Sequence, residues 1–448
     1  MSNLTLKDIE ELLRKGNKEQ IEEAIDSIHP ADILEIIHDH PDHADLILSK
    51  LPNDMIADII EEEDDEDDQY TLLTSLLKDR QREILDEMSD DELADIVGEL
   101  DEEEKSQVLS NLDHDDKQTI ENLLTYDPET AGGLMTTDYI SIRAKNTVLD
   151  TLNYLHSASL EDLPKYYLYV VDKDGILKGV VSLRDIVESS FDTPILDITN
   201  ENVKTINYLE DQEDVAKTFM KYSFIMMPVV DDENRMLGII EIDDIMDVIE
   251  DETTEDINLM AGMSGEERVD STLIESYISR VPWLIVNLAT AVMAAAVVDK
   301  FSGTIAKVVS LASIMSIVTG MGGNAGTQSL TILVRGLSLG EIDRDNALKI
   351  FFKEVGVGLL TGITIGIFVG LGSWWFAHNP WFGLVAALAM ILNMVAANIA
   401  GYLVPVVLRK CHIDPALASG VFVTTVTDCL GFLFFLGLAT LFLPLLVQ

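Results

Sequence analysis

Apolar residues are spaced in three different ways along the chain, and each spacing predicts a different kind of element. Through residues 1–125 they recur three and four positions apart, as in 33–37 and 56–60, which is the spacing of short amphipathic helices. His-Pro and Leu-Pro pairs separate these stretches, and Ser89 to Glu92 has the form of a capping box that opens a further helix. The first part of the chain is therefore expected to be an all-α helical domain.

From about residue 137 the apolar residues instead form short runs of the β type. Runs at 166–171 and 177–181 flank an Asp-Lys-Asp-Gly turn, and runs at 225–230 and 237–242 flank an acidic turn about 60 residues later. A helical stretch follows each pair of runs. This α/β repeat of strand, turn, strand and helix resembles a tandem cystathionine-β-synthase (CBS) pair.

CBS pairs often bind adenosine nucleotides, and their signature is a Ser or Thr three residues before an Asp. The first repeat has this signature as Ser182 and Asp185. In the second repeat Glu241 and Asp244 stand at these positions, so a carboxylate replaces the phosphate-binding hydroxyl. The resemblance therefore implies one intact nucleotide site, at Ser182 and Asp185, with ATP as its ligand.

Beyond residue 270 the apolar runs become long enough to cross a bilayer, which takes roughly 20 residues. Residues 1–13 lack the basic and apolar regions of a secretory signal, so we expect the preceding part to lie in the cytosol. The loops around 335–353 and 409–410, which contain Arg and Lys, then face the cytosol as well. With five spans, the C-terminus is expected outside the plasma membrane. The five predicted spans are 281–299, 308–334, 355–377, 381–408 and 415–446.

Charge separates the same two parts, because residues 1–270 carry 71 acidic and 21 basic side chains whereas residues 271–448 carry 8 and 9. The deficit of Lys and Arg argues against nucleic acid as a partner, since phosphate binding depends on basic side chains. The two cysteines cannot form a disulfide framework. We find no nucleophile–base set, phosphate loop or metal-hydrolase spacing, so we do not expect an enzyme.

A run of carboxylates lies between the second repeat and the first span, on neighbouring turns of one predicted helix. Like charges three and four residues apart destabilise a helix. Either the acids form a solvated face, or a divalent cation relieves their repulsion. A site rich in oxygen and free of Cys and His favours Mg²⁺ or Ca²⁺. The run consists of Asp243, Asp244, Asp247, Glu250, Asp251, Glu252, Glu255 and Asp256.

Two polar interruptions stand out in the apolar spans. Four glycines within Gly320–Ser329 disfavour a straight helix, so we expect irregular backbone there, with freed carbonyls and the side chains of Asn324 and Gln328 supplying oxygens. The alternative is a packing notch. The last span contains Asp428, and a carboxylate within a membrane span indicates a functional site unless it is protonated and merely hydrogen-bonded.

In a symmetric oligomer, two copies of Asp428 would face one axis. Two negative charges beside a small polar cavity attract a divalent cation strongly. Because Mg²⁺ releases its water reluctantly, such a site would hold the hydrated ion through outer-shell hydrogen bonds.

Several motifs in this order resemble the MgtE family of magnesium channels and transporters. The resemblance implies a homodimer, with five spans in each subunit and a pore on the two-fold axis. The motifs are YDPETAGGLMTTDYI at 126–140, RVPWL at 280–284, GGNAGTQ at 322–328 and DPALASGVFVTTVTD at 414–428.

The resemblance also implies roles for residues of the pore. Asp428 is implied to be the selectivity carboxylate, with the Thr424 carbonyl nearby. Asn324 falls in the pore-lining glycine segment, and Leu417 falls at a cytoplasmic constriction. Gly420 stands where some members have a side-chain amide, so that contact is absent here.

The family is gated by Mg²⁺ that binds between its cytosolic domains. The acids before the membrane, Asp244, Asp247, Glu252, Glu255 and Asp256, match family positions, as do Asp91 and Asp95 on a helix of the first domain. The family often has Tyr-Asp where this chain has Tyr222-Ser223, so one ligand is lost or replaced.

Together these features predict a multi-domain membrane protein. We expect an acidic helical domain at 1–130, the CBS pair at 131–250, a connecting (plug) helix at 251–275 and a five-helix transmembrane bundle at 276–448. The predicted function is a Mg²⁺-selective channel that closes when cytosolic Mg²⁺ is high. A coupled divalent-cation exchanger and a non-conducting, membrane-anchored nucleotide or metal sensor are the alternatives.

Overall fold

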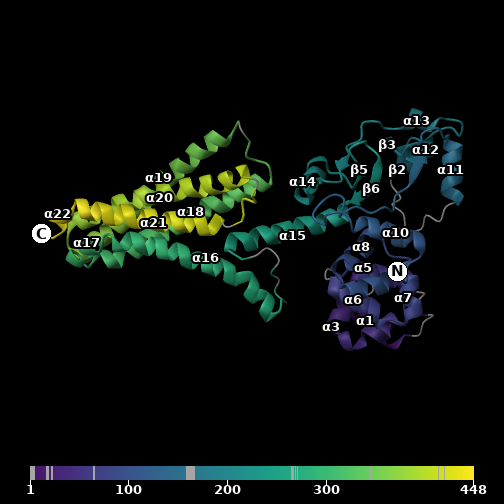
Figure 1. Ribbon diagram of the computed structural model, residues 1–448, viewed down its shortest axis with the longest axis horizontal. Coiled ribbons are helices and arrows are strands. Elements are labelled where there is room, and N and C mark those ends of the chain that lie inside the picture. Colours follow the sequence, from purple (N-terminus) through teal and green to yellow (C-terminus); the bar gives the residue numbers. More distant parts are fainter. Residues whose placement is uncertain are drawn as a thin grey trace. The chain divides into compact units, whose positions relative to one another are not determined.

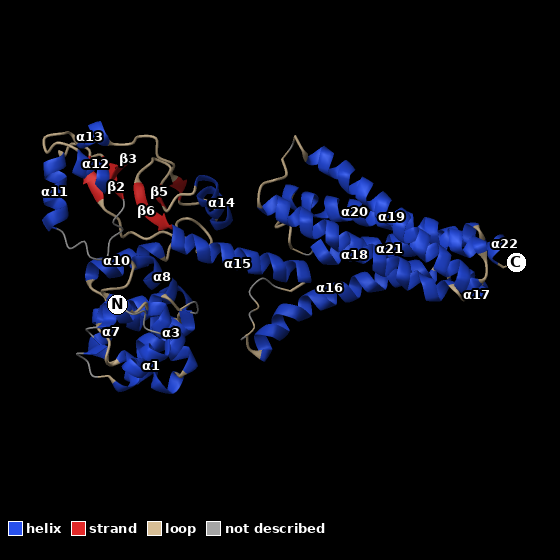
Figure 2. Ribbon diagram, turned by 180° about the vertical axis from the view of Figure 1, so that it is seen from behind, coloured by secondary structure: helices blue, strands red, loops and turns tan. Residues whose placement is uncertain are grey.

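A computed structural model describes residues 6–16, 20–21, 24–63, 66–157, 167–263, 267, 269, 271–343, 345–411, 413–417 and 419–447. The chain divides into two compact units, Met1–Ile249 and Glu250–Gln448. Among the described residues, strands occur only in the first unit, and the second is built from helices (Figures 1 and 2).

Short helices form the first half of unit 1, as the apolar spacing predicts. The apolar residues of 33–37 and 56–60 are buried, and the side chains of Asp101 and Asp113 accept hydrogen bonds that begin two of the helices. The helices are α1 (Leu6–Lys15), α3 (Pro30–Asp39), α4 (Ala44–Leu48), α5 (Asn53–Glu61), α6 (Glu66–Ser75), α7 (Lys78–Leu85), α8 (Asp90–Glu99), α9 (Glu102–Leu109) and α10 (His114–Leu123), with short 3₁₀ turns at Ile25–Ser27 and Pro41–His43.

The two predicted repeats form two three-stranded sheets with the same topology. In each sheet the first strand is parallel to the second, which pairs with the third in a hairpin. Gly179 pairs with Val170, and Gly238 pairs with Val229 at the matching register. The elements are β1 (Ser141–Arg143), α11 (Val148–Ser157), β2 (Tyr167–Val171), β3 (Leu177–Ser182), α12 (Leu183–Glu188), α13 (Ile195–Ile198), β4 (Ile206–Asn207), α14 (Gln212–Tyr222), β5 (Met226–Val230) and β6 (Met236–Glu241).

The helical half and the second CBS repeat share one hydrophobic core. Ala131 and Met135 join this core, which also contains Val215 and Phe219 of α14. Backbone hydrogen bonds in both directions tie Thr136 to Ile239 of β6, at 2.9 and 3.0 Å. The N-terminus of α8 is thereby brought to the corner where β6 ends.

Helix α15 (Ile242–Ala261) begins at that corner and contains the predicted acidic run. Its bounds differ from the 251–275 expected for the connecting helix. No Pro or Gly interrupts residues 242–261, so the last helix of the CBS pair continues without a break. Gly262 has a φ of +79°, a left-handed conformation that ends helices and favours glycine.

Five helices of more than 20 residues lie in the described part of unit 2, at the positions of the five predicted spans. Four are long and apolar enough to cross a membrane by length and composition, within the part of the chain described: Leu273–Asp299, Ala347–Ala377, Pro380–Lys410 and Gly420–Leu441. The fifth contains the polar glycine segment and falls below that apolar criterion. The helices are α16 (Leu273–Asp299), α17 (Ser302–Lys307), α18 (Leu311–Ser338), α19 (Ala347–Ala377), α20 (Pro380–Lys410), α21 (Ser419–Leu441) and α22 (Leu443–Leu446).

The expectation of irregular backbone at Gly320–Ser329 is wrong, because α18 is helical throughout this segment. Its glycines allow close packing instead. A Cβ at Gly322 would collide with Asn393 of α20, and one at Gly326 would lie 2.5 Å from Val423 of α21. The segment therefore supplies contact surface, and its backbone carbonyls stay within a regular helix.

Candidate functional site

Threonines surround Asp428 on α21, and their hydroxyls bond to the carbonyls of their own helix. The Thr424 hydroxyl donates to the Gly420 carbonyl at 2.9 Å, and the Thr427 hydroxyl donates to the Thr424 carbonyl at 3.0 Å. Such bonds satisfy a hydroxyl locally in an apolar helix. Asp428 lies one turn after Thr424, so the two share a face of α21.

Asp428 is partly exposed on the surface of the single chain. Within the described residues, it forms neither a hydrogen bond nor a salt bridge. No basic side chain there neutralises it. An uncompensated carboxylate on an apolar helix requires water, a cation or another polar surface.

An exposed polar stripe runs along α18. Asn324, Thr327, Gln328 and Thr331 are exposed and recur at helical spacing, whereas the glycines and leucines on the other face are buried. In a membrane-spanning unit, such a stripe must meet a watery cavity or another protein surface.

The stripe on α18 and the acid on α21 flank one helix contact. A Cβ at Gly323, next to Asn324, would lie 3.9 Å from the Thr427 hydroxyl, next to Asp428. The polar groups of both helices thus border the same seam.

The C-terminal end of α15 contacts the beginning of α21 within unit 2. Leu259 shares a hydrophobic cluster with Leu330 and Val423, and Leu417 packs against that cluster. A Cβ at Gly420 would lie 2.8 Å from the Met260 carbonyl, so glycine permits this approach. The constriction residue implied by the family resemblance therefore lies beside the end of α15.

A second polar centre lies in unit 1, where the N-terminus of α8 meets the β6–α15 corner. The Thr137 hydroxyl donates to the Asp90 carboxylate, and the Asp90 N–H donates to Asp138 at 3.3 Å. The Oδ1 atom of Asp91 is buried and has no hydrogen-bond partner among the described residues.

Burial and mutual repulsion raise the pKa values of these carboxyl groups. Burial, followed by the charge of Asp91, raises the pKa of Asp244 well above its usual range. Burial, followed by repulsion from Asp243 and Asp91, raises the pKa of Glu241 to about 7. Burial, followed by repulsion from Asp90, raises the pKa of Asp138 to about 6. Crowded carboxylates of this kind favour a bound cation.

Within the described residues, no three His, Cys, Asp or Glu side chains lie close enough together to hold a metal ion.

Comparisons with known proteins match most of the chain. The matching family models are the MgtE divalent cation transporter over 315–438, the MgtE intracellular N domain over 28–129, and the CBS domain over 131–192 and 195–251. A magnesium transporter MgtE of Bacillus subtilis is 32% identical over 433 residues, which is 96% of both chains. The chain belongs to the MgtE family.

Other MgtE proteins are similar over shorter stretches. The magnesium transporter MgtE of Enterococcus faecalis is 39% identical over 325 residues, or 72% of this chain and 71% of the relative. A crystal structure of the cytosolic domain of the Mg²⁺ channel MgtE in complex with ATP is 34% identical, with a TM-score of 0.51. It covers 55% of this chain and all of that one.

These matches confirm the predicted family, the helical N domain, the CBS pair and a multi-pass helical membrane domain. As a member of a transporter family, the chain is a membrane protein.

The acids implied by the MgtE resemblance lie in different places. Asp91 and Asp244 come close enough to raise the pKa of Asp244, whereas Asp95 and Asp247 are exposed further along the same helices. Glu252 and Glu255 lie on the part of α15 that belongs to unit 2. There, the Ser338 hydroxyl at the end of α18 donates to Asp256 at 3.2 Å.

Sequence reasoning did not single out Asp90, Asp138 or Glu241 as members of the acidic cluster. Asp138 lies within the motif at 126–140, and Glu241 is the departure from the CBS nucleotide signature. Both carboxylates could therefore be noticed in the sequence, but the sequence did not show that they lie close to the acidic cluster.

The nucleotide signature has a structural role of its own. Ser182 and Asp185 form a capping box at the start of α12, in which the Ser182 hydroxyl accepts from the Asp185 N–H at 3.1 Å. Asp185 is exposed and Ser182 partly so.

Proposed function

We propose that this chain forms a homodimeric Mg²⁺ channel with an ion path on the two-fold axis. The observation that supports this most strongly is the exposed polar stripe of α18 beside the uncompensated Asp428. Two copies that face each other across these surfaces would remove them from lipid and create a polar passage.

In such a passage the two Asp428 carboxylates provide the charge that favours a divalent cation over Na⁺ or K⁺. Mg²⁺ keeps its hydration water, which donates hydrogen bonds to these carboxylates, to the Thr424 carbonyl and to the Asn324 side chain. Conduction then requires no dehydration step.

Cytosolic Mg²⁺ closes the channel by neutralising the acidic faces. Without the ion, burial raises the pKa of Asp244, and the nearby charge of Asp91 raises it further; both effects oppose a compact arrangement of ionised groups. Bound Mg²⁺ removes that repulsion along α8 and α15. The end of α15 lies beside Leu417, so its position determines whether the constriction is open. A change from 1:99 to 99:1 takes about 5.5 kcal/mol, which several weak sites supply together.

This arrangement places the N-terminus and both acidic regions in the cytosol and the C-terminus outside the cell. Five spans, with α18 among them, are consistent with basic residues in the loops on the cytosolic side.

ATP is the proposed ligand of the first CBS repeat, supported by the Ser182–Asp185 pair and by the similar cytosolic domain described with ATP. Replacing Ser182 with Ala is expected to weaken ATP binding about tenfold or more, because a phosphate loses a hydroxyl partner. Calorimetric titration of the full chain measures this. Asp211→Ala removes the cap of α14 in the other repeat and serves as the control. Equal ATP affinity in Ser182→Ala and wild type would contradict the site.

Flux into liposomes tests the channel. We expect the wild-type chain to admit Mg²⁺ and Asp428→Ala to abolish the flux without loss of assembly. Asp299→Asn, which removes an exposed aspartate at the end of α16, provides a matched control that should conduct normally. Normal flux through Asp428→Ala would remove that residue from the pore.

The same assay separates the two alternatives. Flux that requires a Na⁺ or H⁺ gradient would indicate an exchanger, and a wild-type chain without any flux would indicate a sensor.

A further inference from the structure

A buried carboxylate lies on α19 of the membrane unit. Glu354 of α19 is 3% exposed, on a helix apolar enough to span a membrane. A buried carboxylate is costly unless it has partners. Its partners in the described part of the chain are the Ser329 hydroxyl, which donates at 2.8 Å, and the Lys353 ammonium at 3.3 Å.

The two partners have different roles. The Lys353 side chain is 60% exposed, so its ammonium balances the charge of Glu354 from the surface. Ser329 is buried and belongs to another helix, α18. The hydrogen bond from Ser329 therefore joins two helices, whereas the ion pair lies within one.

Ser329 is also held from its other side, by α20. Its hydroxyl lies 3.5 Å from the Asn398 carbonyl. A Cβ at Gly401 would lie 2.7 Å from the Gly326 carbonyl and 2.8 Å from the Ser329 Cβ, so the α18 and α20 backbones touch here. The C-terminal end of the polar segment is thus confined between α19 and α20.

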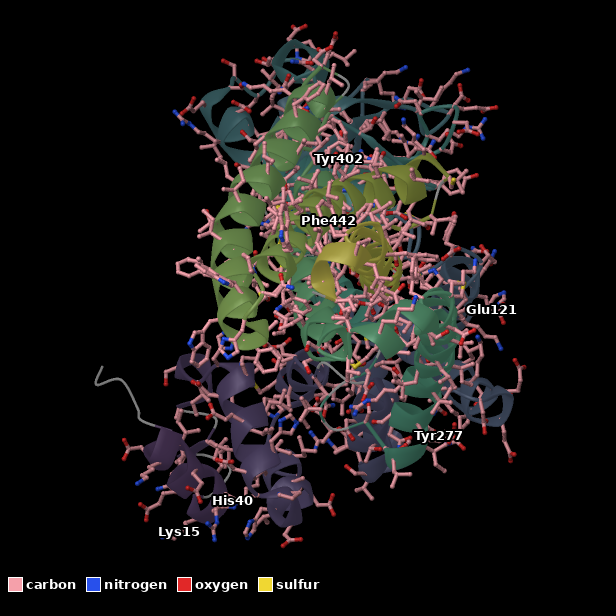
Figure 3. The ribbon with its side chains drawn as sticks, turned by 90° about the vertical axis from the view of Figure 1, so that its left-hand side faces the viewer. Lys15, His40, Glu121, Tyr277, Tyr402 and Phe442 are labelled. Atoms are coloured by element: carbon pink, nitrogen blue, oxygen red, sulfur yellow. The ribbon has the colours of Figure 1, made fainter. Side chains whose placement is uncertain are left out.

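The support behind this contact is rigid. Glycines of α19 lie against the α20 backbone, and a Cβ at Gly362 or Gly366 would approach it to 3.0 Å. At the start of α19, the Tyr402 hydroxyl donates to the Ala347 carbonyl at 2.9 Å (Tyr402 is labelled in Figure 3). Helices α19 and α20 are therefore closely packed against each other behind the contact with α18.

We propose that Glu354 is a positioning residue for ion permeation. Through Ser329 it fixes the rotation of α18 against the α19–α20 pair, so that the stripe containing Asn324 and Gln328 stays directed toward the ion path beside Asp428. Glu354 itself does not contact the ion. This inference rests on the proposed function, in which that stripe lines the pore.

The test uses the full chain in liposomes and compares variants at both ends of the hydrogen bond. Glu354→Gln keeps an acceptor of the same shape and is expected to retain most of the Mg²⁺ flux. Glu354→Ala and Ser329→Ala each lose the bond, and about tenfold less flux is expected, with weaker discrimination of Mg²⁺ against Ca²⁺. The double variant should be no worse than the more severe single variant, because both substitutions remove one interaction.

Ser373→Ala is the matched control, since Ser373 is a buried serine of α19 whose hydroxyl has no partner among the described residues. It should conduct and select normally. Size-exclusion chromatography checks the assembly of each variant. If Glu354→Ala does not fold, the comparison of Ser329→Ala with Glu354→Gln still tests the positioning role.

The outcomes separate the inference from the proposed function. Wild-type flux together with unchanged flux and selectivity in Ser329→Ala and Glu354→Ala would overturn the positioning role alone. Additive losses in the double variant would also overturn it. A wild-type chain without flux would overturn both proposals. Retention of flux in Glu354→Gln, together with non-additive flux losses in the double variant, would support the inference.

Discussion

Replacing Asp138 with Asn should stabilise unit 1 when no Mg²⁺ is present. Asp138 accepts the Asp90 N–H at 3.3 Å, and an asparagine oxygen can accept the same bond. The substitution therefore removes the charge while keeping the contact. Burial and the neighbouring charges of Asp90 and Asp91, which raise the pKa of Asp138 from 3.8 to about 6, then no longer oppose folding.

The size of the effect follows from that pKa. The difference between 3.8 and about 6 corresponds to about 3 kcal/mol, because each tenfold change in proton affinity is worth about 1.4 kcal/mol. Burial of the amide offsets part of it, so we expect a gain of about 1 to 3 kcal/mol at pH 7.5. For a unit of this size, the unfolding temperature should rise by roughly 2 to 10 °C.

The pH dependence has a definite sign. The folded state holds the Asp138 proton more tightly than the unfolded state, so the contribution of Asp138 to stability is greatest below pH 3.8 and is lost as the pH rises through about 6. The advantage of the variant should thus be near zero at pH 4 and complete by pH 7.

The assay is thermal unfolding of the full chain in detergent and chelator, followed by circular dichroism. Hydrogen exchange of residues 136–140 assigns the transition to unit 1. Asp150→Asn is the control with the opposite sign, since hydrogen bonds from the Thr147 N–H and hydroxyl lower the pKa of Asp150. A variant at Asp138 that is no more stable than wild type, or equally favoured at pH 4 and 7.5, would refute the reasoning.

Two further predictions concern unit 2. Neutralising Glu255 and Asp256 together (E255Q, D256N) should keep Mg²⁺ flux high at cytosolic Mg²⁺ concentrations that close the wild type, because α15 loses carboxylates of the proposed switch. The exposed pair Glu250 and Asp251, neutralised as E250Q and D251N, is the control. Unchanged inhibition by Mg²⁺ in the first variant would count against the switch. Gly326→Ala should destabilise the membrane unit by about 1 to 3 kcal/mol and reduce flux, because its Cβ would lie 2.5 Å from Val423. Gly356→Ala is the control, because a Cβ at Gly356 would have no neighbouring atom within 4 Å; this substitution should leave the stability of the membrane unit unchanged or raise it slightly. Equal unfolding temperatures and fluxes for the two variants would argue against close α18–α21 packing.

The apolar spacing was enough to predict the element types, because it reports which face of each element is buried. It could not distinguish a broken helix from a closely packed one at Gly322 and Gly326. Their packing partners, Asn393 and Val423, lie far along the chain, and only the tertiary structure brings them together.

The acidic sites show the same limit. Asp91 and Asp244 could be named through the family motif, but Asp138 has a raised pKa only because folding buries it beside Asp90. Glu354 follows Lys353 in the sequence and resembles an ordinary surface pair. Its burial depends on Ser329 and α20, so local sequence gives no sign of it.

The continuity of α15 has a mechanical consequence. At 1.5 Å per residue, its 20 residues form a lever about 30 Å long, with carboxylates along it and Met260 near its tip. A tilt of about 10° about one end would displace the other by about 5 Å, which is comparable to one helical turn. In the proposed gating, a stiff helix would transmit a displacement from the ion-binding end to the other end, whereas a flexible linker would dissipate it.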